Sequence, residues 1–268
     1  MPDPGRNGDR TDFKVVGRRD IPTRVAPHIC SGLAKYSSDI IFPNMLFGKV
    51  LRSPYANARI KSMDTSKAEA LEGVKAVITW EDEWIRNLGP TIDGWGKIMA
   101  QYTKEYLLDN VSLREDHEIG VCVAAETEEL CDEALKLIAD TIDWEVLPHI
   151  TDYLDADKPG APIIRPDLNP DSNLWKEWIW EKGDVAAGFN EATHTVEYDW
   201  TCPQYVQFFP EPASTTSYWE QSEKTDVGET LYMTGVDLRR QTPDRVRAAF
   251  GLTEDKVRYL NTYAISCY

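Results

Sequence analysis

Hydrophobic and polar positions along residues 25–148 follow two different repeats, one typical of strands and one typical of helices. Five short apolar or β-branched runs have the length and composition of strands, namely residues 45–51, 58–63, 74–79, 119–125 and 141–146. A short helix is predicted over 67–72, after the capping oxygens of residues 64–66 and before Gly73. The pattern therefore predicts a mixed α/β (α+β) domain with few turns of helix per strand.

A longer helix is predicted directly after the strand at 119–125, because Thr127 is placed to cap its N-terminus. Its apolar residues recur at helical spacing and trace one stripe that would lie on the sheet: Leu130, Ala134, Leu137 and Ile138. Cys131 lies beside this stripe, and we expect its small thiol to fill the core rather than to perform chemistry.

Two stretches of different composition divide the chain. Residues 1–24 are polar and rich in glycine, proline and charge, and they lack the apolar core of a secretion signal, which predicts a mobile or partner-clasping arm. Residues 149–174 contain four prolines and several aspartates, which predicts an extended connector without regular structure. We therefore expect the main domain boundary at this connector.

The remaining segment, residues 175–268, begins with three tryptophans and a turn signal. A short turn or helical piece is predicted over 187–192. Residues 193–201 alternate, with His194, Val196, Tyr198 and Trp200 on one face and polar residues on the other, which predicts a half-buried strand. Three further elements are predicted: a strand at 231–236, a helix from Thr242 to a closing Gly251, and a strand at 257–260.

Charge and composition narrow the function classes. Lysine and arginine number 29 against 45 for aspartate and glutamate, so the net charge of −16 disfavours nucleic acid and other polyanions as partners. No apolar run approaches the ~18 residues of a membrane-spanning helix. The five cysteines form no C-x-x-C pair and the four histidines are scattered, which disfavours a disulfide framework, a zinc site or an iron–sulfur site in this chain. We therefore expect a reducing, cytoplasmic location.

Short catalytic motifs such as G-x-S-x-G, G-x-G-x-x-G and H-E-x-x-H do not occur in the sequence. Longer segments are more informative, since many occur in a fixed order: 32–40 (GLAKYSSDI), 43–48 (PNMLFG), 51–60 (LRSPYANARI), 119–126 (IGVCVAAE), 144–148 (WEVLP), 183–185 (GDV) and 245–249 (RVRAA). In these segments the chain resembles the large, molybdopterin-binding subunit of the xanthine oxidase family of molybdenum hydroxylases.

The resemblance implies an architecture and a chemistry. Residues 25–148 would form the α/β-hammerhead domain of the family, and residues 175–268 the first part of its molybdopterin-binding domain. In this family a molybdenum ion on a pterin, in its plain or cytosine dinucleotide form, activates water for attack on an electron-poor carbon. Electrons then leave through [2Fe-2S] clusters and usually FAD. The implied partners are therefore an iron–sulfur subunit and, in many members, a flavin subunit.

After the predicted strand at 257–260 the family carries a glycine-rich loop, but here the sequence continues from Asn261 to Tyr268 and ends. The resemblance implies that this loop, most pterin contacts and the glutamate base lie on a second large-subunit fragment. That fragment would complete the molybdopterin-binding domain. A truncated copy of a longer protein is the alternative, and the neighbouring reading frame distinguishes the two.

Residues 203–212 correspond to the stretch that lines the cofactor pocket of the family. Gln207 stands where a histidine is usual, and Tyr205 stands where xanthine-oxidising members have a glutamine. Packing in a core or an interface is the alternative role for the aromatic side chains. The resemblance assigns cofactor binding to the first three candidates and the substrate pocket to the last three: Gln204, Tyr205 and Gln207, then Phe208, Phe209 and Glu211.

Asp237 stands where the family has an amide. If it faces the pocket, its carboxyl would serve as a catalytic acid or base, and if it faces water it is an ordinary loop residue. No metal ligand is assigned to this chain. Together these departures favour an aromatic or polycyclic substrate over xanthine or a simple aldehyde.

Three functions stay open on this evidence. The first is a subunit of a hydroxylase, and the second is a hydratase that adds water across a conjugated double bond without net redox change. The third is a scaffold subunit without catalytic residues. Dependence on an electron acceptor distinguishes the first two, and the molybdenum content of the purified complex separates both from the third.

Overall fold

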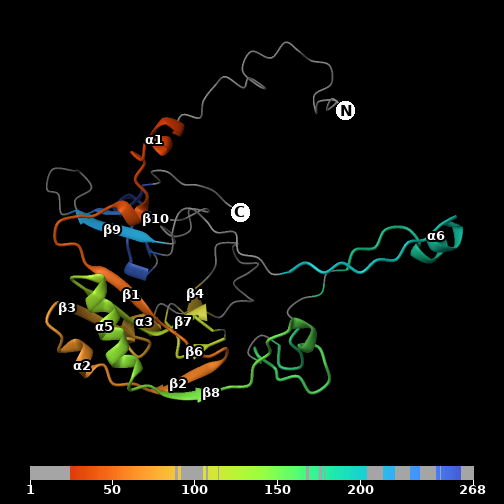
Figure 1. Ribbon diagram of the computed structural model, residues 1–268, viewed down its shortest axis with the longest axis horizontal. Coiled ribbons are helices and arrows are strands. Elements are labelled where there is room, and N and C mark those ends of the chain that lie inside the picture. The colour runs from red at the N-terminus through yellow and green to blue at the C-terminus, as the bar shows by residue number, and fades with distance from the viewer. Residues whose placement is uncertain are drawn as a thin grey trace, which may run out of the picture. The chain divides into compact units, whose positions relative to one another are not determined.

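The computed structural model describes residues 25–87, 90–91, 105–106, 108–113, 115–166, 169–174, 177, 179–203, 214–220, 230–235, 246–247 and 249–260 (Figure 1). Contacts divide the chain into two compact units. The larger unit spans Phe42–Gln207 and Arg239–Leu252, and the smaller spans Met1–Ile41, Phe208–Leu238 and Thr253–Tyr268. The domain boundaries expected from composition stay predictions.

An antiparallel three-stranded sheet in the order β1–β7–β3 forms one layer of the larger unit. Strand β7 (Glu118–Ala125) lies between β1 (Phe47–Arg52) and β3 (Val74–Thr79), and Val123 pairs with Lys49 on one side and Val77 on the other. A strand that is covered on both faces reads as a nearly continuous apolar run, and residues 119–125 of β7 are all buried or half-buried. The strands predicted at 45–51, 74–79 and 119–125 are confirmed.

A second antiparallel sheet in the same unit has the order β6–β2–β8. Its central strand is β2 (Ala58–Ser62), flanked by β6 (Val111–Ser112) and β8 (Asp143–Val146). A short pair joins β4 (Pro90–Thr91) to β5 (Glu105–Tyr106). The strands predicted at 58–63 and 141–146 are confirmed, with the second beginning two residues later than expected.

The described residues around these sheets include the helices α2 (Ser66–Glu69), α3 (Glu83–Asn87) and α5 (Glu128–Ala139). The predicted cap of α5 is confirmed, because the Thr127 side chain accepts a hydrogen bond from the Leu130 backbone N–H at 3.2 Å. The core face of the helix is slightly rotated from the predicted stripe. Its fully buried residues are Cys131, Ala134 and Ile138, whereas Leu130 and Leu137 are only partly buried.

Cys131 is fully buried, as expected for a core residue. Its thiol donates to the backbone carbonyl of Phe47 in β1 at 3.2 Å, so this side chain faces the sheet directly. Burial raises the pKa of the Cys131 thiol. The prediction that Cys131 fills the core is therefore confirmed.

Gly120 in β7 lies close to Ile60 of β2, a strand of the other sheet. Its backbone has φ of 71°, which only glycine adopts without strain. Its N–H donates to the Asp109 carbonyl at 2.8 Å, and its carbonyl accepts from the Trp80 N–H at 2.9 Å. A Cβ at this position would lie 2.6 Å from Cδ1 of Ile60 in β2. Only glycine therefore fits between the backbone bonds and the shared core.

The proline-rich connector differs from the extended segment that its composition predicts. It contains a turn of 3₁₀ helix, η2 (Tyr153–Asp155), and folds into a loop (Figure 1). The Asn173 amide donates to the carbonyls of Ala156 at 3.0 Å and Pro162 at 2.9 Å, and its oxygen accepts from the Ile164 N–H at 2.8 Å. One side chain thus replaces the backbone hydrogen bonds that a proline-rich segment cannot make for itself.

Helix α6 (Val185–Glu191) lies in the middle of a segment of 25 residues, 179–203, that we call the α6 segment. The helix begins at Asp184, whose carboxylate accepts the Ala187 N–H at 2.9 Å, and it confirms the helical piece predicted over 187–192. The strand predicted over 193–201 is wrong for the structure. These residues are exposed and form no strand, and no backbone hydrogen bond joins them to another described residue.

The smaller unit contains a three-stranded sheet in the order β11–β10–β9. Strand β10 (Thr230–Gly235) is antiparallel to β9 (Thr215–Glu220) and parallel to β11 (Val257–Tyr259). The strands predicted at 231–236 and 257–260 are confirmed. The short helical elements of this unit are α1 (Ala26–Cys30), η1 (Ser37–Asp39) and η3 (Glu254–Lys256).

The helix predicted between Thr242 and Gly251 is described only in part. Residues 246–247 and 249–250 are helical, and Gly251 has φ of 63°, the conformation expected of a closing glycine. The predicted start of this helix lies outside the described residues.

Candidate functional site

The seven residues predicted to act on cofactor or substrate all lie outside the described residues: Gln204, Tyr205, Gln207, Phe208, Phe209, Glu211 and Asp237. Their roles therefore stay predictions. The structure does describe the two strands to which these segments connect, β9 and β10. The arrangement of the strand ends is the part of the site that can be built from the structure.

The start of β9 and the end of β10 lie side by side. The two strands are antiparallel, and Thr215, the first residue of β9, pairs with Gly235, the last residue of β10. Glu211 precedes Thr215 by four positions, and Asp237 follows Gly235 by two. Both predicted segments therefore connect to the same end of this sheet.

Strand β11 leaves the sheet at that end too. It runs parallel to β10, Met233 pairs with Tyr259, and the Leu260 N–H donates to the Met233 carbonyl at 2.8 Å. Ligand sites in many folds lie just beyond the carboxyl ends of parallel neighbouring strands. Three connections thus meet at one sheet end, and two of them lead directly to predicted site residues.

Ser37 of η1 holds the start of β9 in place. This serine is 1% exposed, and its hydroxyl lies 2.5 Å from the Ser214 hydroxyl and 3.2 Å from the Ser214 carbonyl, to which it donates. The buried Thr216 hydroxyl donates in turn to the Ser37 carbonyl at 2.8 Å. These contacts connect an N-terminal turn to the strand that follows the predicted pocket segment.

Sequence reasoning missed the role of Ser37, which was noted only within the segment 32–40 that carries the resemblance. A local signal was present, because Asp39 accepts the Tyr36 backbone N–H at 3.0 Å and shapes the turn that presents Ser37. The partner Ser214 lies 177 positions away along the chain, which no local pattern indicates.

The pKa shifts among the described residues have structural causes. Burial raises the pKa of Cys122 in β7 as it does that of Cys131, and hydrogen bonds from Ser66 lower the pKa of Asp64 at the start of α2. In the part of the chain that the structure describes, no group of three His, Cys, Asp or Glu side chains could hold a metal ion. In the same residues, no helix is long and apolar enough to cross a membrane.

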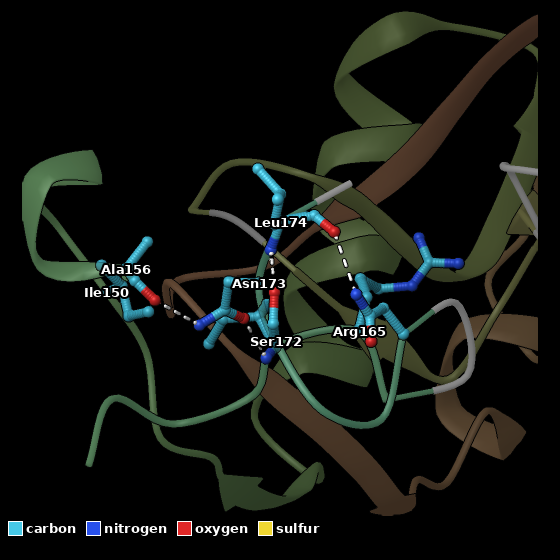
Figure 2. A pocket seen from close by; sticks show the side chains of 8 residues that line it. Ile150, Ala156, Arg165, Ser172, Asn173 and Leu174 are labelled. Carbon is cyan, nitrogen blue, oxygen red and sulfur yellow. Dashed lines mark hydrogen bonds between the residues drawn. The ribbon is translucent and has the colours of Figure 1, made fainter. Parts of the chain in front are cut away.

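A cavity of about 360 Å³ lies within the folded connector (Figure 2). Its wall is mostly apolar, formed by Ile150, Ala156, Ile164 and Leu174, and Figure 2 shows Asn173 and Ser172 with their hydrogen bonds inside the loop. The polar atoms of Asn173 are used by the backbone, so they hold the loop rather than face a ligand. This cavity therefore has a structural origin and is not the predicted site.

Comparison with known proteins shows to which class this architecture belongs. Residues 31–148 match the family described as aldehyde oxidase and xanthine dehydrogenase, a/b hammerhead domain. Among solved structures, quinoline 2-oxidoreductase from Pseudomonas putida has a TM-score of 0.71 at 22% identity, with 90% of this chain and 30% of that chain covered. This second likeness concerns the fold alone. The class is thus a hammerhead-type α/β protein.

Two relatives extend the match beyond the hammerhead domain. One subunit of the probable xanthine dehydrogenase of Bacillus subtilis is 30% identical over 246 residues, which cover 90% of this chain and 30% of that protein. The carbon monoxide dehydrogenase large chain of Afipia carboxidovorans is 39% identical over 244 residues, covering 85% of this chain and 28% of that protein. The chain belongs to the xanthine oxidase family of molybdenum hydroxylases and matches part of their large subunit. It spans less than a third of the length of these two relatives.

Proposed function

We propose that this chain is part of the large subunit of a heteromeric molybdenum hydroxylase that acts on an aromatic or polycyclic substrate. In the proposed reaction, water and a C–H bond give a C–OH bond, two protons and two electrons, and the electrons pass to iron–sulfur and flavin subunits. The observation that carries this proposal is the alignment of 85% of the chain with the carbon monoxide dehydrogenase large chain of Afipia carboxidovorans at 39% identity.

The sheet end described above fits a molybdenum–pterin group in the kind of polar groups that it offers. Among the described residues, the buried polar side chains near this sheet end are the neutral hydroxyls of Ser37, Thr216 and Thr234. The predicted cofactor contacts add neutral amides and a phenol, which hydrogen-bond to oxo and pterin atoms without introducing charge. When bound, the molybdenum–pterin group supplies a water-derived nucleophile and takes up the electron pair.

The proposed roles of this chain's own residues follow from their chemistry. Gln204 and Gln207 bind and orient the cofactor through their amides, and Tyr205 donates a hydrogen bond from its hydroxyl. Phe208, Phe209 and Glu211 line the substrate pocket, where the two phenyl rings exclude water and stack on an aromatic substrate.

We propose that the Asp237 carboxylate holds or moves a proton in this pocket, two residues beyond the end of β10. Because Thr215 pairs with Gly235, this carboxylate and the 204–211 segment are joined to neighbouring strand ends. That arrangement supports a shared site.

The proposed partners follow from the share of its relatives that the chain spans. A companion polypeptide would carry the rest of the molybdopterin-binding domain, including the cytosine dinucleotide site if the pterin has that form. Iron–sulfur and flavin subunits would carry the [2Fe-2S] clusters and FAD. The cysteine pattern supports a cytoplasmic location for this assembly.

The test is purification of the native complex through a tag on this chain, followed by molybdenum and pterin analysis and a substrate screen with a dye as electron acceptor. We expect about one molybdenum per complex and dye reduction that depends on a nitrogen-containing aromatic substrate. Product formation without any acceptor would indicate the hydratase instead. A complex that lacks molybdenum would refute both and leave the scaffold function.

A further inference from the structure

The α6 segment (residues 179–203) exposes more apolar surface than a soluble chain normally leaves in contact with water. Its four aromatic residues are largely exposed: Trp180 at 93%, Phe189 at 66%, Tyr198 at 72% and Trp200 at 84%. Side chains of this kind bury roughly 150–250 Å² each, so together they leave on the order of 600 Å² open. Aromatic residues are enriched at protein interfaces, so this much exposed aromatic surface on one short segment, with Tyr198 and Trp200 side by side, indicates an interaction site.

The exposed residues are arranged as two one-sided elements. In α6, Val185 and Phe189 are four positions apart and therefore share one helix face, and both are 66% exposed. Beyond the helix, the side chains of Val196, Tyr198 and Trp200 alternate with polar ones. The rings of Tyr198 and Trp200 lie 5.0 Å apart between centroids, as expected of next-but-one neighbours on one side of an extended chain.

Residues 193–201 have a strand's pattern but lack a strand's neighbour among the described residues. Their alternation is that of a half-buried strand, yet their backbone N–H and C=O groups make no hydrogen bond within the part of the chain that the structure describes. An extended segment in this state is suited to add itself as a strand to the sheet edge of another polypeptide.

Resting on the proposed function, we propose that the α6 segment binds the companion polypeptide that carries the rest of the large subunit. Residues 193–201 add a strand to a sheet of that companion, and the face formed by Val196, Tyr198 and Trp200 packs on its core. The chain spans only 30% of the length of its Bacillus subtilis relative, so most of such a subunit lies outside the matched part.

The exposed area and the charge of the α6 segment both favour the companion polypeptide as its binding partner. A stable interface buries about 800 Å² on each partner, and the exposed aromatic area of the α6 segment supplies most of that. The segment carries five acidic residues and one lysine, so the complementary surface is basic at its rim. A second copy of the same acidic segment would be repelled.

The experiment is site-specific photocrosslinking in the native complex, in the source organism. p-Benzoylphenylalanine replaces Tyr198 on the apolar face in one strain and Glu197 on the polar face in a matched control. We expect the probe at 198 to crosslink to a polypeptide that aligns with the unmatched part of large-subunit relatives, with at least tenfold less product from the probe at 197.

Three results would overturn the proposal: crosslinks from position 198 only within this chain, only between two copies of it, or none at all.

A second measurement uses two triple variants that alter opposite faces of the segment. The apolar-face variant should weaken binding of the companion at least a hundredfold, and the polar-face variant less than about threefold. These variants are Val196→Ser, Tyr198→Ser and Trp200→Ser, against the charge-preserving Thr195→Ser, Glu197→Asp and Asp199→Glu.

Both triple variants should unfold at the same temperature as the parent chain, because the residues they change are exposed and make no core contact. Molybdenum content separates this inference from the proposed function. A companion crosslinked at 198 in a complex without molybdenum would support the interface and refute the enzyme. A molybdenum-containing complex without that crosslink would support the enzyme and refute the interface.

Discussion

Replacing Gly120 with alanine tests whether the junction between the two sheets of the larger unit depends on glycine. The new methyl group would lie 2.6 Å from Cδ1 of Ile60 and 3.4 Å from Cε3 of Trp80, and the backbone would keep its φ of 71°. The positive φ costs an L-residue about 1–2 kcal/mol, and overpacking a tight core costs about 1–3 kcal/mol. The entropy lost by the unfolded chain offsets about 0.4–1 kcal/mol.

The net destabilisation expected for Gly120→Ala is about 3 kcal/mol, which corresponds to a fall in Tm of roughly 6–12 °C for a chain of this size. Thermal unfolding followed by circular dichroism measures it. Gly48→Ala in β1 is the matched control, since a Cβ there meets nothing within 4 Å. For that variant we expect a Tm within about 2 °C of the parent, or slightly above it.

A double variant separates the two causes of the loss. Ile60→Val removes the atom that the new methyl group would strike and by itself costs about 0.5–1.5 kcal/mol. If the clash is real, Gly120→Ala combined with Ile60→Val is less destabilised than the sum of the single variants, and only the backbone strain remains. Equal losses for Gly120→Ala and Gly48→Ala, or strict additivity with Ile60→Val, would refute the reasoning.

Three further predictions concern a helix cap, a buried thiol and the proposed proton carrier. Thr127→Ala removes the hydrogen bond to the Leu130 N–H and should cost about 1 kcal/mol in urea unfolding, whereas Thr65→Ala, whose side chain does not cap α2, should cost less than about half of that. Because burial raises the pKa of Cys131, its thiolate is scarce at pH 8, so iodoacetamide should label the exposed Cys30 and Cys202 in the native chain and reach Cys131 only after unfolding; labelling at equal rates would contradict the core position. Asp237→Asn should lower kcat of the native complex by about 10²–10⁴-fold with unchanged molybdenum content, and unchanged kcat would exclude a role in proton transfer.

The elements that could be predicted from the sequence are those whose signals are local. The strand at 74–79 and the cap at Thr127 depend on β-branched residues and on a side-chain oxygen, and both were placed correctly. The prediction of which face of α5 is buried was slightly wrong. Cys131, rather than Leu130 or Leu137, is fully buried and contacts the Phe47 carbonyl across 84 positions, a contact that no local pattern contains.

The connector and the 193–201 segment show where local signals fail. The four prolines predict an extended spacer, but the hydrogen bonds of Asn173 fold this segment into a loop. The composition of the segment does not indicate that contact. The alternation of 193–201 is that of a strand, but a strand also needs a neighbouring strand to pair with. The alternation does not indicate whether such a neighbour is present. The candidate site residues came from a resemblance, and the structure contributes the sheet end to which their segments are attached.

The contact between Ser37 and Thr216 has a consequence for biosynthesis. The two residues are 179 positions apart, so a ribosome adding about 5–20 residues per second needs roughly ten to forty seconds between them. All strands of the β1–β7–β3 and β6–β2–β8 sheets emerge within that interval. The turn that carries Ser37 is therefore translated first among these elements but docks late. A nascent chain passes through a stage in which the strands of both sheets of the larger unit have been translated, while β9, β10 and β11 of the smaller unit have not.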